Sequence, residues 1–241
     1  MTPLLLIPGW GMNRRVWAPC LPALEGAAEL RLADSPGVEK SFDAAARALG
    51  EAVPPGGAVC GWSLGALLAM RAARLWPGRF GALILVGATP CFVKREGWDA
   101  AQPAELLRDF AAAVAADAAA ALRHFVALFN QGDAKARAIV REIGRGVLSS
   151  PPPPAGALLA GLDWLRDVDL RGCVPEISCP ALLIHGERDP LMPLSAGRWL
   201  AEKLPRARLE VFAGAAHAPF LNDPERFARR IGEFLRDGRL E

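Results

Sequence analysis

The stretch that decides the fold is Ala58-Val59-Cys60-Gly61-Trp62-Ser63-Leu64-Gly65-Ala66. Residues 58–62 form an apolar run that favours a buried β-strand, and residues 64–75 have the spacing of a helix. Ser63 therefore lies at a sharp strand-to-helix turn, which exposes a serine hydroxyl as a nucleophile. Gly61 and Gly65 make this turn possible, because a Cβ at either position would collide with a neighbouring element. The pattern Gly-x-Ser-x-Gly is weak alone, so the prediction depends on the strand and the helix beside it.

Further short apolar runs alternate with helical patterns on both sides of this stretch. Continuous apolar strands separated by helices are typical of a mostly parallel sheet that helices cover on both faces. We therefore predict an α/β fold that closes with an amphipathic helix at about residues 224–235. Its expected strands are residues 4–7, 30–33, 58–62, 82–86, 181–185 and 208–212.

The alternation is interrupted between the strand that ends near Val86 and the strand that starts near Ala181. Residues 99–169 have only helical patterns, and four consecutive prolines at 151–154 interrupt them. We predict that residues 1–98 and 170–241 form the core and that residues 99–169 form an all-helical lid. Such a lid would cover the carboxyl ends of the strands, where open α/β sheets bind ligands. The alternative is that these helices only enlarge the hydrophobic core.

A serine hydroxyl needs a base that takes its proton, and the chain contains three histidines. His124 belongs to the predicted lid, as a surface or pocket-wall residue. His185 ends the fifth strand, where packing in the core is the expected role. His217 follows the sixth strand in a loop that can reach the turn at Ser63. We therefore predict that His217 is the general base.

The acid that orients this base is expected in the loop after the fifth strand, because serine, acid and histidine follow in that order when the nucleophile lies on such a turn. This loop contains Glu187 and Asp189. Asp189 lies further beyond the strand and directly before Pro190, which fixes the turn, so Asp189 is the predicted acid. Glu187 is the alternative acid; its expected role otherwise is a solvated ion pair with Arg188.

The same mechanism requires donors for the negative oxygen of the tetrahedral intermediate. One predicted donor is the backbone N–H of Leu64, at the start of the helix after the nucleophile. The other is the backbone N–H of Trp10 in the loop after the first strand, where Gly9 and Gly11 free the backbone to turn. Ser63, Asp189, His217 and these two donors match the roles in a serine-histidine-aspartate mechanism.

Composition excludes several classes of partner. The formal net charge is +2 over 241 residues, which gives no reason to expect nucleic-acid binding. No apolar run approaches the roughly 18 residues of a membrane-spanning helix, and the start lacks a basic signal region. The five cysteines are widely spread and form no Cys-x-x-Cys pair, which argues against disulfides and a zinc site. We expect a cytoplasmic monomer that needs no metal or organic cofactor.

Several segments together resemble one family, the esterases of biotin synthesis that demethylate pimeloyl-[acyl-carrier protein] methyl ester. The narrowest of them are Gly9-Trp10-Gly11, residues 61–65 and Ala216-His217-Ala218-Pro219-Phe220. The first and last of these belong to longer similar stretches, residues 8–13 and 215–220. Further similar stretches are residues 16–17, 89–92 and 168–171, so the resemblance spans nearly the whole chain. It implies an α/β-hydrolase fold and a carboxylesterase that acts at the far end of a carrier-bound acyl chain.

The resemblance also implies roles for individual residues. Trp10 and Leu64 would supply the oxyanion N–H groups, and Trp10 and Trp62 would contact the substrate. Phe125 matches an aromatic lid residue that shapes the acyl site. Arg137 and Arg141 match lid arginines that contact the acyl carrier protein.

Charge spacing supports this partner independently. Arg137, Arg141 and Arg145 are four residues apart and share one face of a helix. Acyl carrier proteins are acidic, so electrostatic steering is physically sensible. The alternative is an ordinary solvated face. The local charges counted in this prediction are these arginines with Arg123 and Lys135, against Asp133 and Glu142.

Some positions depart from the family. Ala120 and His124 stand where arginines can occur, and Pro8 stands where many relatives have histidine. Carrier contact is therefore expected to be weaker or differently arranged. Three other functions stay open: a generalist carboxylesterase or thioesterase, a non-catalytic binding protein of the same fold, and a cofactor-free lyase.

Overall fold

The computed structural model describes residues 1–35 and 41–237 of the chain. At its centre lies a parallel sheet with the strand order β2-β1-β3-β4-β5-β6. Each strand begins and ends within one residue of its predicted bounds, so the α/β fold is confirmed. The strands are β1 (Pro3–Ile7), β2 (Glu29–Leu32), β3 (Ala58–Trp62), β4 (Ala82–Val86), β5 (Ala181–Gly186) and β6 (Ala207–Phe212).

The burial of the strands explains why their sequence patterns differ. Every residue of β3, β4 and β5 is buried, because these strands lie inside the sheet between two layers of helices. The edge strands β2 and β6 are mostly only partly buried and include exposed residues such as Glu29 and Arg208. Continuous apolar runs therefore mark the centre of the sheet, at the strand that carries the nucleophile turn.

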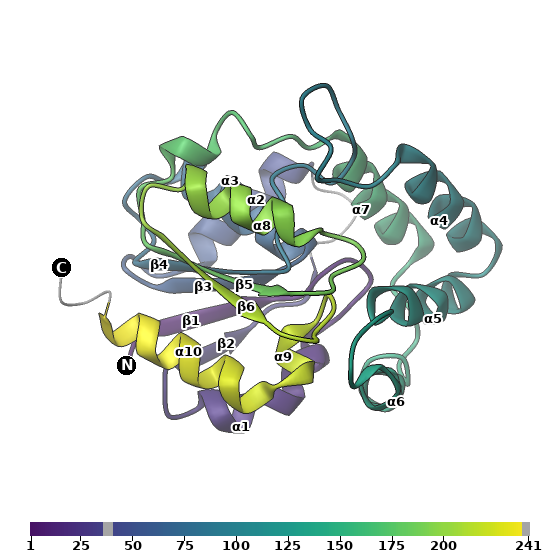
Figure 1. The fold of residues 1–241 in the computed structure, drawn as a ribbon, viewed down its shortest axis with the longest axis horizontal. Coiled ribbons are helices and arrows are strands. Elements are labelled where there is room, and N and C mark those ends of the chain that lie inside the picture. Colours follow the sequence, from purple (N-terminus) through teal and green to yellow (C-terminus); the bar gives the residue numbers. More distant parts are fainter. Residues whose placement is uncertain (36–40, 238–241) are drawn as a thin grey trace.

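Helices cover both faces of the sheet (Figure 1). One face carries α2 (Phe42–Ala52), α3 (Leu64–Leu75) and α8 (Leu194–Lys203). The other carries α1 (Leu21–Leu24) and α10 (Pro224–Asp237), and α10 buries one apolar side of its amphipathic sequence. Shorter segments are the 3-10 helices Arg14–Cys20 and Val174–Glu176, and α9 (Pro219–Asn222) directly before α10.

Four helices lie between β4 and β5, at one end of the sheet (Figure 1). They are α4 (Ala104–Ala116), α5 (Ala118–Phe129), α6 (Ala136–Gly146) and α7 (Ala155–Asp167). Pro103 and Pro154 directly precede α4 and α7, where a proline costs no helical hydrogen bond. The Asp117 side chain caps α5 by accepting from the Ala120 N–H at 2.9 Å. We refer to these four helices and their connections as the lid.

The five cysteines are all free thiols. Burial raises the pKa of Cys20 to about 12 and that of Cys60 well above its ordinary value, so both are protonated at neutral pH. Cys60 lies in β3 beside the nucleophile turn and packs as a small apolar residue. In the described part of the chain, every helix is too short or too polar to cross a lipid bilayer.

Candidate active site

Ser63 occupies a strained turn between β3 and α3. Its φ of 57° and ψ of −120° make it the one non-glycine residue with positive φ in the described ranges. A Cβ at Gly61 would lie 2.3 Å from the Gly65 carbonyl oxygen, and a Cβ at Gly65 would lie 2.7 Å from the carbonyl oxygens of Ile7 and Pro8. Neither glycine therefore has room for a side chain, as predicted. Such strain at a serine between a strand and a helix is the geometry of a nucleophile turn.

His217 and Asp189 meet in the interior of the molecule. The loop after β5 carries Asp189 and the loop before α9 carries His217. The Nδ1 atom of His217 donates to Oδ2 of Asp189 at 2.7 Å, and both side chains are fully buried. Nε2 of His217 is left without a hydrogen-bond partner among the described residues. A histidine in this tautomer has its free lone pair on the nitrogen that a general base uses.

The surroundings of Asp189 keep it ionised. Burial alone would raise the pKa of Asp189, but its interactions with the His217 and His185 rings and with the Met192 N–H together outweigh burial and leave this pKa lowered. The backbone N–H groups of Leu191 and Met192 also donate to Oδ1, each at 2.9 Å. A carboxylate with three such donors is held in one orientation, which in turn fixes the imidazole ring.

His185 is fully buried, as predicted, and also lies near Asp189, the predicted acid. Its Nε2 lies 2.7 Å from the Met192 carbonyl oxygen and 3.6 Å from Oδ2 of Asp189. Burial lowers the pKa of His185, so its ring stays neutral and donates from Nε2 to the Met192 oxygen. The sequence contained no signal for this second contact of Asp189, because it depends on how the loop after β5 folds back on its own strand.

Trp62 supports the backbone of His217. Its Nε1 donates to the His217 carbonyl oxygen at 2.8 Å, and the two rings lie 5.6 Å apart. The Trp62 ring also packs edge-on against Phe129 and Phe220, and only 1% of the residue is exposed. The resemblance implied a substrate contact for Trp62, which stays a prediction. The support that it gives to His217 was not foreseen.

The loop after β1 brings the backbone before Trp10 close to Ser63, the predicted nucleophile. A Cβ at Gly9 would lie 3.0 Å from Cβ of Ser63, so the backbone of this loop passes directly beside the serine. Leu64 is the first residue of α3, and its N–H therefore has no acceptor within its own helix. Both predicted oxyanion donors thus lie next to Ser63. The Trp10 indole Nε1 donates to the Leu158 carbonyl oxygen of α7 at 2.7 Å, which joins this loop to the lid.

Aromatic residues of the lid cover this loop. The rings of Phe125 in α5 and Phe110 in α4 lie edge-on to Trp10, at 4.9 and 5.9 Å between ring centres. Phe125 is buried but does not line the cavity described next, so its part in an acyl site stays a prediction. His124 lies on the exposed side of α5, as predicted. An apolar cavity of about 220 Å³ adjoins both predicted oxyanion donors and continues toward α7; its lining includes Trp10, Leu64, Met12, Leu158, Gly161 and Trp164.

The model of the alpha/beta hydrolase family matches residues 4–230 of the chain. The chain belongs to the alpha/beta hydrolase family. Among curated relatives, this hydrolase is 38% identical to a pimeloyl-[acyl-carrier protein] methyl ester esterase of Aromatoleum aromaticum, over 97% of this chain and 98% of the relative. It is 36% identical to the protein of the same name from Serratia marcescens, over 96% of this chain and 93% of the relative.

Solved structures share the fold of this hydrolase. An esterase from Exiguobacterium antarcticum superposes with a TM-score of 0.83 at 22% identity, covering 98% of this chain and 92% of that one. A bromoperoxidase from Bacillus anthracis gives 0.84 at 21% identity, with the same coverage of both chains. At these identities the similarity establishes the fold alone, and the two names show that this fold serves different reactions.

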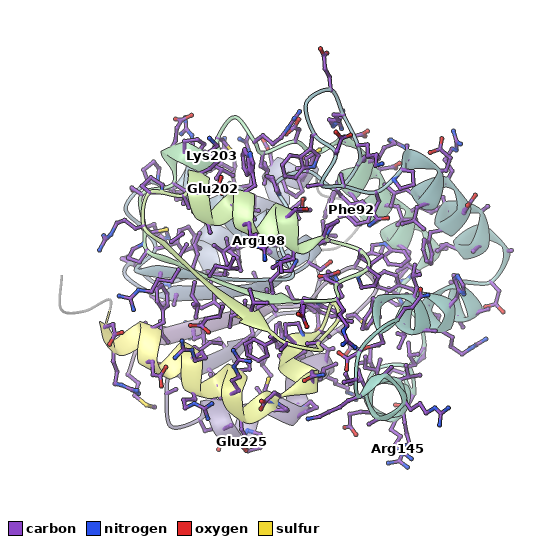
Figure 2. The ribbon with its side chains drawn as sticks, in the orientation of Figure 1. Phe92, Arg145, Arg198, Glu202, Lys203 and Glu225 are labelled. Atoms are coloured by element: carbon purple, nitrogen blue, oxygen red, sulfur yellow. The ribbon has the colours of Figure 1, made fainter. Side chains whose placement is uncertain are left out.

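The lid of the hydrolase carries the predicted basic stripe on α6. Arg137, Arg141 and Arg145 are all exposed, and Figure 2 shows Arg145 at the periphery of the molecule. Two residues counted in this patch have other roles. Lys135 Nζ donates to the Asn222 carbonyl oxygen at 2.7 Å, and Asp133 is buried. Lys135 is thus tied to the segment after His217, and the three arginines form the exposed stripe on α6.

The ion pair expected between Glu187 and Arg188 is wrong. Glu187 Oε2 accepts from the Gly214 N–H at 2.9 Å, and Arg188 Nη1 donates to the Gly132 carbonyl oxygen at 3.3 Å. The turn before His217 offers a free N–H that Glu187 satisfies, so the two neighbours point to different segments. Across residues 1–35 and 41–237, no cluster of three histidine, cysteine or acidic side chains could hold a metal ion.

Proposed function

We propose that this hydrolase is a carboxylesterase that demethylates pimeloyl-[acyl-carrier protein] methyl ester in biotin synthesis. The substrate follows from the two curated relatives, which share 38% and 36% of their residues with it over nearly the full length of both chains. The reaction type has its support in one observation, the buried hydrogen bond between His217 and Asp189. His217 is joined through its carbonyl oxygen to Trp62, the residue directly before the strained Ser63. The catalytic roles below are part of the same proposal.

The reaction proceeds in two halves. Nε2 of His217 takes the Ser63 proton while Oγ attacks the ester carbonyl carbon, and Asp189 stabilises the imidazolium that forms. The backbone N–H groups of Trp10 and Leu64 bind the oxyanion, and each such donor contributes on the order of 3 kcal/mol to the transition state. Collapse of the intermediate expels methanol, which receives the proton from His217. Water then attacks the acyl-enzyme with His217 again as base, which releases the free carboxylate and regenerates Ser63.

An apolar cavity beside the two proposed oxyanion donors is the proposed place for the acyl chain. The cavity next to Trp10 and Leu64 measures about 220 Å³, enough for a short hydrocarbon chain, and its lining is mostly apolar. The proposal keeps Trp10, Trp62 and Phe125 as substrate contacts. A chain of this kind is neutral, so hydrophobic burial would supply its affinity and the carrier would supply specificity.

Helix α6 is the proposed contact with the acyl carrier protein. Arg137 and Arg141 are exposed and flank Val140, which is 37% exposed and, with Met1, one of two exposed large apolar residues in the described ranges. An acidic partner would gain steering from the arginines and a small apolar contact from Val140. The proposal includes a cytoplasmic location, consistent with five free thiols, and a monomeric state.

The first experiment tests the reaction type. Ser63→Ala should abolish hydrolysis of both the carrier-bound pimeloyl methyl ester and a short p-nitrophenyl ester, with an unchanged unfolding temperature. A fluorophosphonate probe should label the wild-type enzyme at Ser63 and leave the variant unlabelled. Wild-type turnover by Ser63→Ala would refute the proposed nucleophile, and an unlabelled wild-type enzyme would favour a non-catalytic binding protein.

The second experiment tests the substrate. Arg137→Glu and Arg141→Glu should raise KM for the carrier-bound ester and leave hydrolysis of the p-nitrophenyl ester unchanged. Arg198→Glu is the matched control, because Arg198 is also exposed but lies on α8, away from the lid (Figure 2). Equal loss with both esters, or no loss with either, would favour the generalist esterase. Rescue of a biotin-requiring strain that lacks its own methyl ester esterase would test the role in the cell.

A further inference from the structure

Asp133 is a buried carboxylate that the proposed mechanism does not use. It lies in the connection between α5 and α6, with 8% of its surface exposed. Its Oδ1 accepts from the Lys135 backbone N–H and from Asn222 Nδ2, each at 2.7 Å, and its Oδ2 accepts from the Ala216 backbone N–H at 2.8 Å. A buried carboxylate costs free energy unless hydrogen bonds satisfy it, and here three donors do so.

Two of these three donors lie on either side of His217. Ala216 directly precedes His217 in the chain, and Asn222 ends the short helix α9 that follows it. Lys135 strengthens the second attachment, because its Nζ donates to the Asn222 carbonyl oxygen at 2.7 Å. One lid carboxylate thus bridges the two ends of the segment that carries the proposed base.

Neighbouring backbone bonds join the same two segments. The His217 N–H donates to the Phe129 carbonyl oxygen at 3.2 Å, and the Ala134 N–H donates to the Gly214 carbonyl oxygen at 2.9 Å. His217 itself lies outside any helix or strand, so no regular ladder holds its backbone. The connection between α5 and α6 therefore supplies part of the rigidity that this loop lacks by itself.

We propose that Asp133 is a positioning residue for the base, which it holds in register with Ser63 by fixing Ala216 and Asn222. This inference depends on the proposed serine mechanism. A catalytic group must be held within about 0.5 Å of its productive position, and a displacement of about 1 Å can cost roughly 100-fold in rate. Through the hydrogen bonds of Asp133 to Ala216 and Asn222, the lid thus helps to position the base in addition to packing over the site.

The test replaces Asp133 by asparagine. The amide has one acceptor oxygen, so its NH₂ group must face either the Ala216 N–H or the two donors at Oδ1, and at least one bond becomes a donor–donor contact. Asn222→Ala is the second variant, because it removes one donor and leaves the carboxylate and its other two bonds. Asp163→Asn is the matched control, since Asp163 lies on the exposed side of α7 with only a surface ion pair to Arg166.

Four measurements separate positioning from folding. We expect Asp133→Asn to lower kcat for a p-nitrophenyl ester by about 10- to 100-fold with KM changed by less than about twofold. The rate of Ser63 modification by a fluorophosphonate should fall in parallel. The downfield proton resonance of the His217–Asp189 hydrogen bond should shift or broaden, while the far-ultraviolet circular dichroism stays that of the folded enzyme. Asn222→Ala should show a smaller loss of the same kind, and the control none.

The outcomes distinguish this inference from the mechanism on which it depends. Folded Asp133→Asn and Asn222→Ala variants with wild-type kcat and labelling rate would overturn the positioning role. If Asp133→Asn does not fold, the Asn222→Ala result decides alone. A wild-type enzyme that neither hydrolyses the ester nor reacts with the fluorophosphonate would refute the serine mechanism itself, whatever the variants do.

Discussion

The alanine substitutions Gly65→Ala and Gly144→Ala should have opposite effects on stability, although both glycines lie in helices. Gly65 is the second residue of α3, beside the nucleophile, and Gly144 lies near the end of α6 in the lid. Helix propensity alone predicts that each alanine stabilises the protein by about 1 kcal/mol. Only the surroundings of the added methyl group differ.

The structure gives the size of that difference. A Cβ at Gly65 would lie 2.7 Å from the carbonyl oxygens of Ile7 and Pro8, which are backbone atoms that no rotamer change can move away. Overpacking costs about 1–3 kcal/mol, and the fixed backbone oxygens place this contact at the upper end, about 3 kcal/mol. After the helix gain of about 1 kcal/mol is subtracted, we expect a net loss of about 2 kcal/mol for Gly65→Ala. A Cβ at Gly144 meets no heavy atom within 4 Å, which leaves the full gain of about 1 kcal/mol. For a chain of this length, each 1 kcal/mol shifts the melting temperature by about 2–4 °C.

The assay is thermal unfolding followed by circular dichroism, with p-nitrophenyl ester hydrolysis measured on the same preparations. Gly65→Ala should also lose activity, because the displaced backbone leads directly to Gly9 and Trp10. Gly144→Ala should keep wild-type activity, since this small ester does not need the carrier. A Gly65→Ala variant with an unchanged or raised melting temperature and full activity would show that α3 and β1 do not approach as closely as the structure has them.

Two further predictions concern side chains around the site. Burial lowers the pKa of His185 below its unfolded value of about 6.5, so below that pH the unfolded chain binds a proton that the folded protein does not. The free energy of unfolding therefore falls as the pH falls, by up to about 1.4 kcal/mol per pH unit. Urea unfolding from about pH 5 to 7.5 should show a shallower pH dependence for His185→Gln than for the wild type or the exposed His124→Gln, and equal slopes would contradict this prediction. A Cβ at Gly161 would lie 2.6 Å from Cδ1 of Trp10, so Gly161→Ala should displace the indole from its hydrogen bond to the Leu158 carbonyl oxygen. This change should lower kcat/KM for the p-nitrophenyl ester by about tenfold or more. Unchanged kinetics would show that the lid does not hold this loop in a catalytically relevant position.

Much of the fold was accessible from the sequence because its signals are local. The apolar runs at β3, β4 and β5 mark buried parallel strands, and Gly61 and Gly65 mark the turn at Ser63. The order of serine, acid and histidine along the chain then favoured His217 among the three histidines as the base. Asp189 was favoured over Glu187 as the acid because it lies further beyond the fifth strand. In the structure the side chains of Asp189 and His217 form a hydrogen bond of 2.7 Å.

The contacts that hold the site together were not accessible in this way. Nothing near Asp133 in the sequence relates it to Ala216, and it was counted there as one charge of the lid surface. The same holds for Lys135, whose Nζ binds the Asn222 carbonyl oxygen, and for Glu187, which caps Gly214 instead of pairing with Arg188. From sequence alone, a charged residue in a loop between two elements is expected to be solvent-exposed, because the sequence does not show which distant segment packs against it.

The sequence by itself thus determined the elements, the nucleophile turn and the types of residue available for the chemistry, because strand burial and glycine geometry leave a local pattern. The tertiary structure alone decided how those residues are held. Phe129 and Asp133 of the lid bind the segment around His217, and Trp62 binds its carbonyl oxygen. These contacts join residues more than 80 positions apart in the chain. Distances of that kind are set by how the lid packs on the core, which no local pattern encodes.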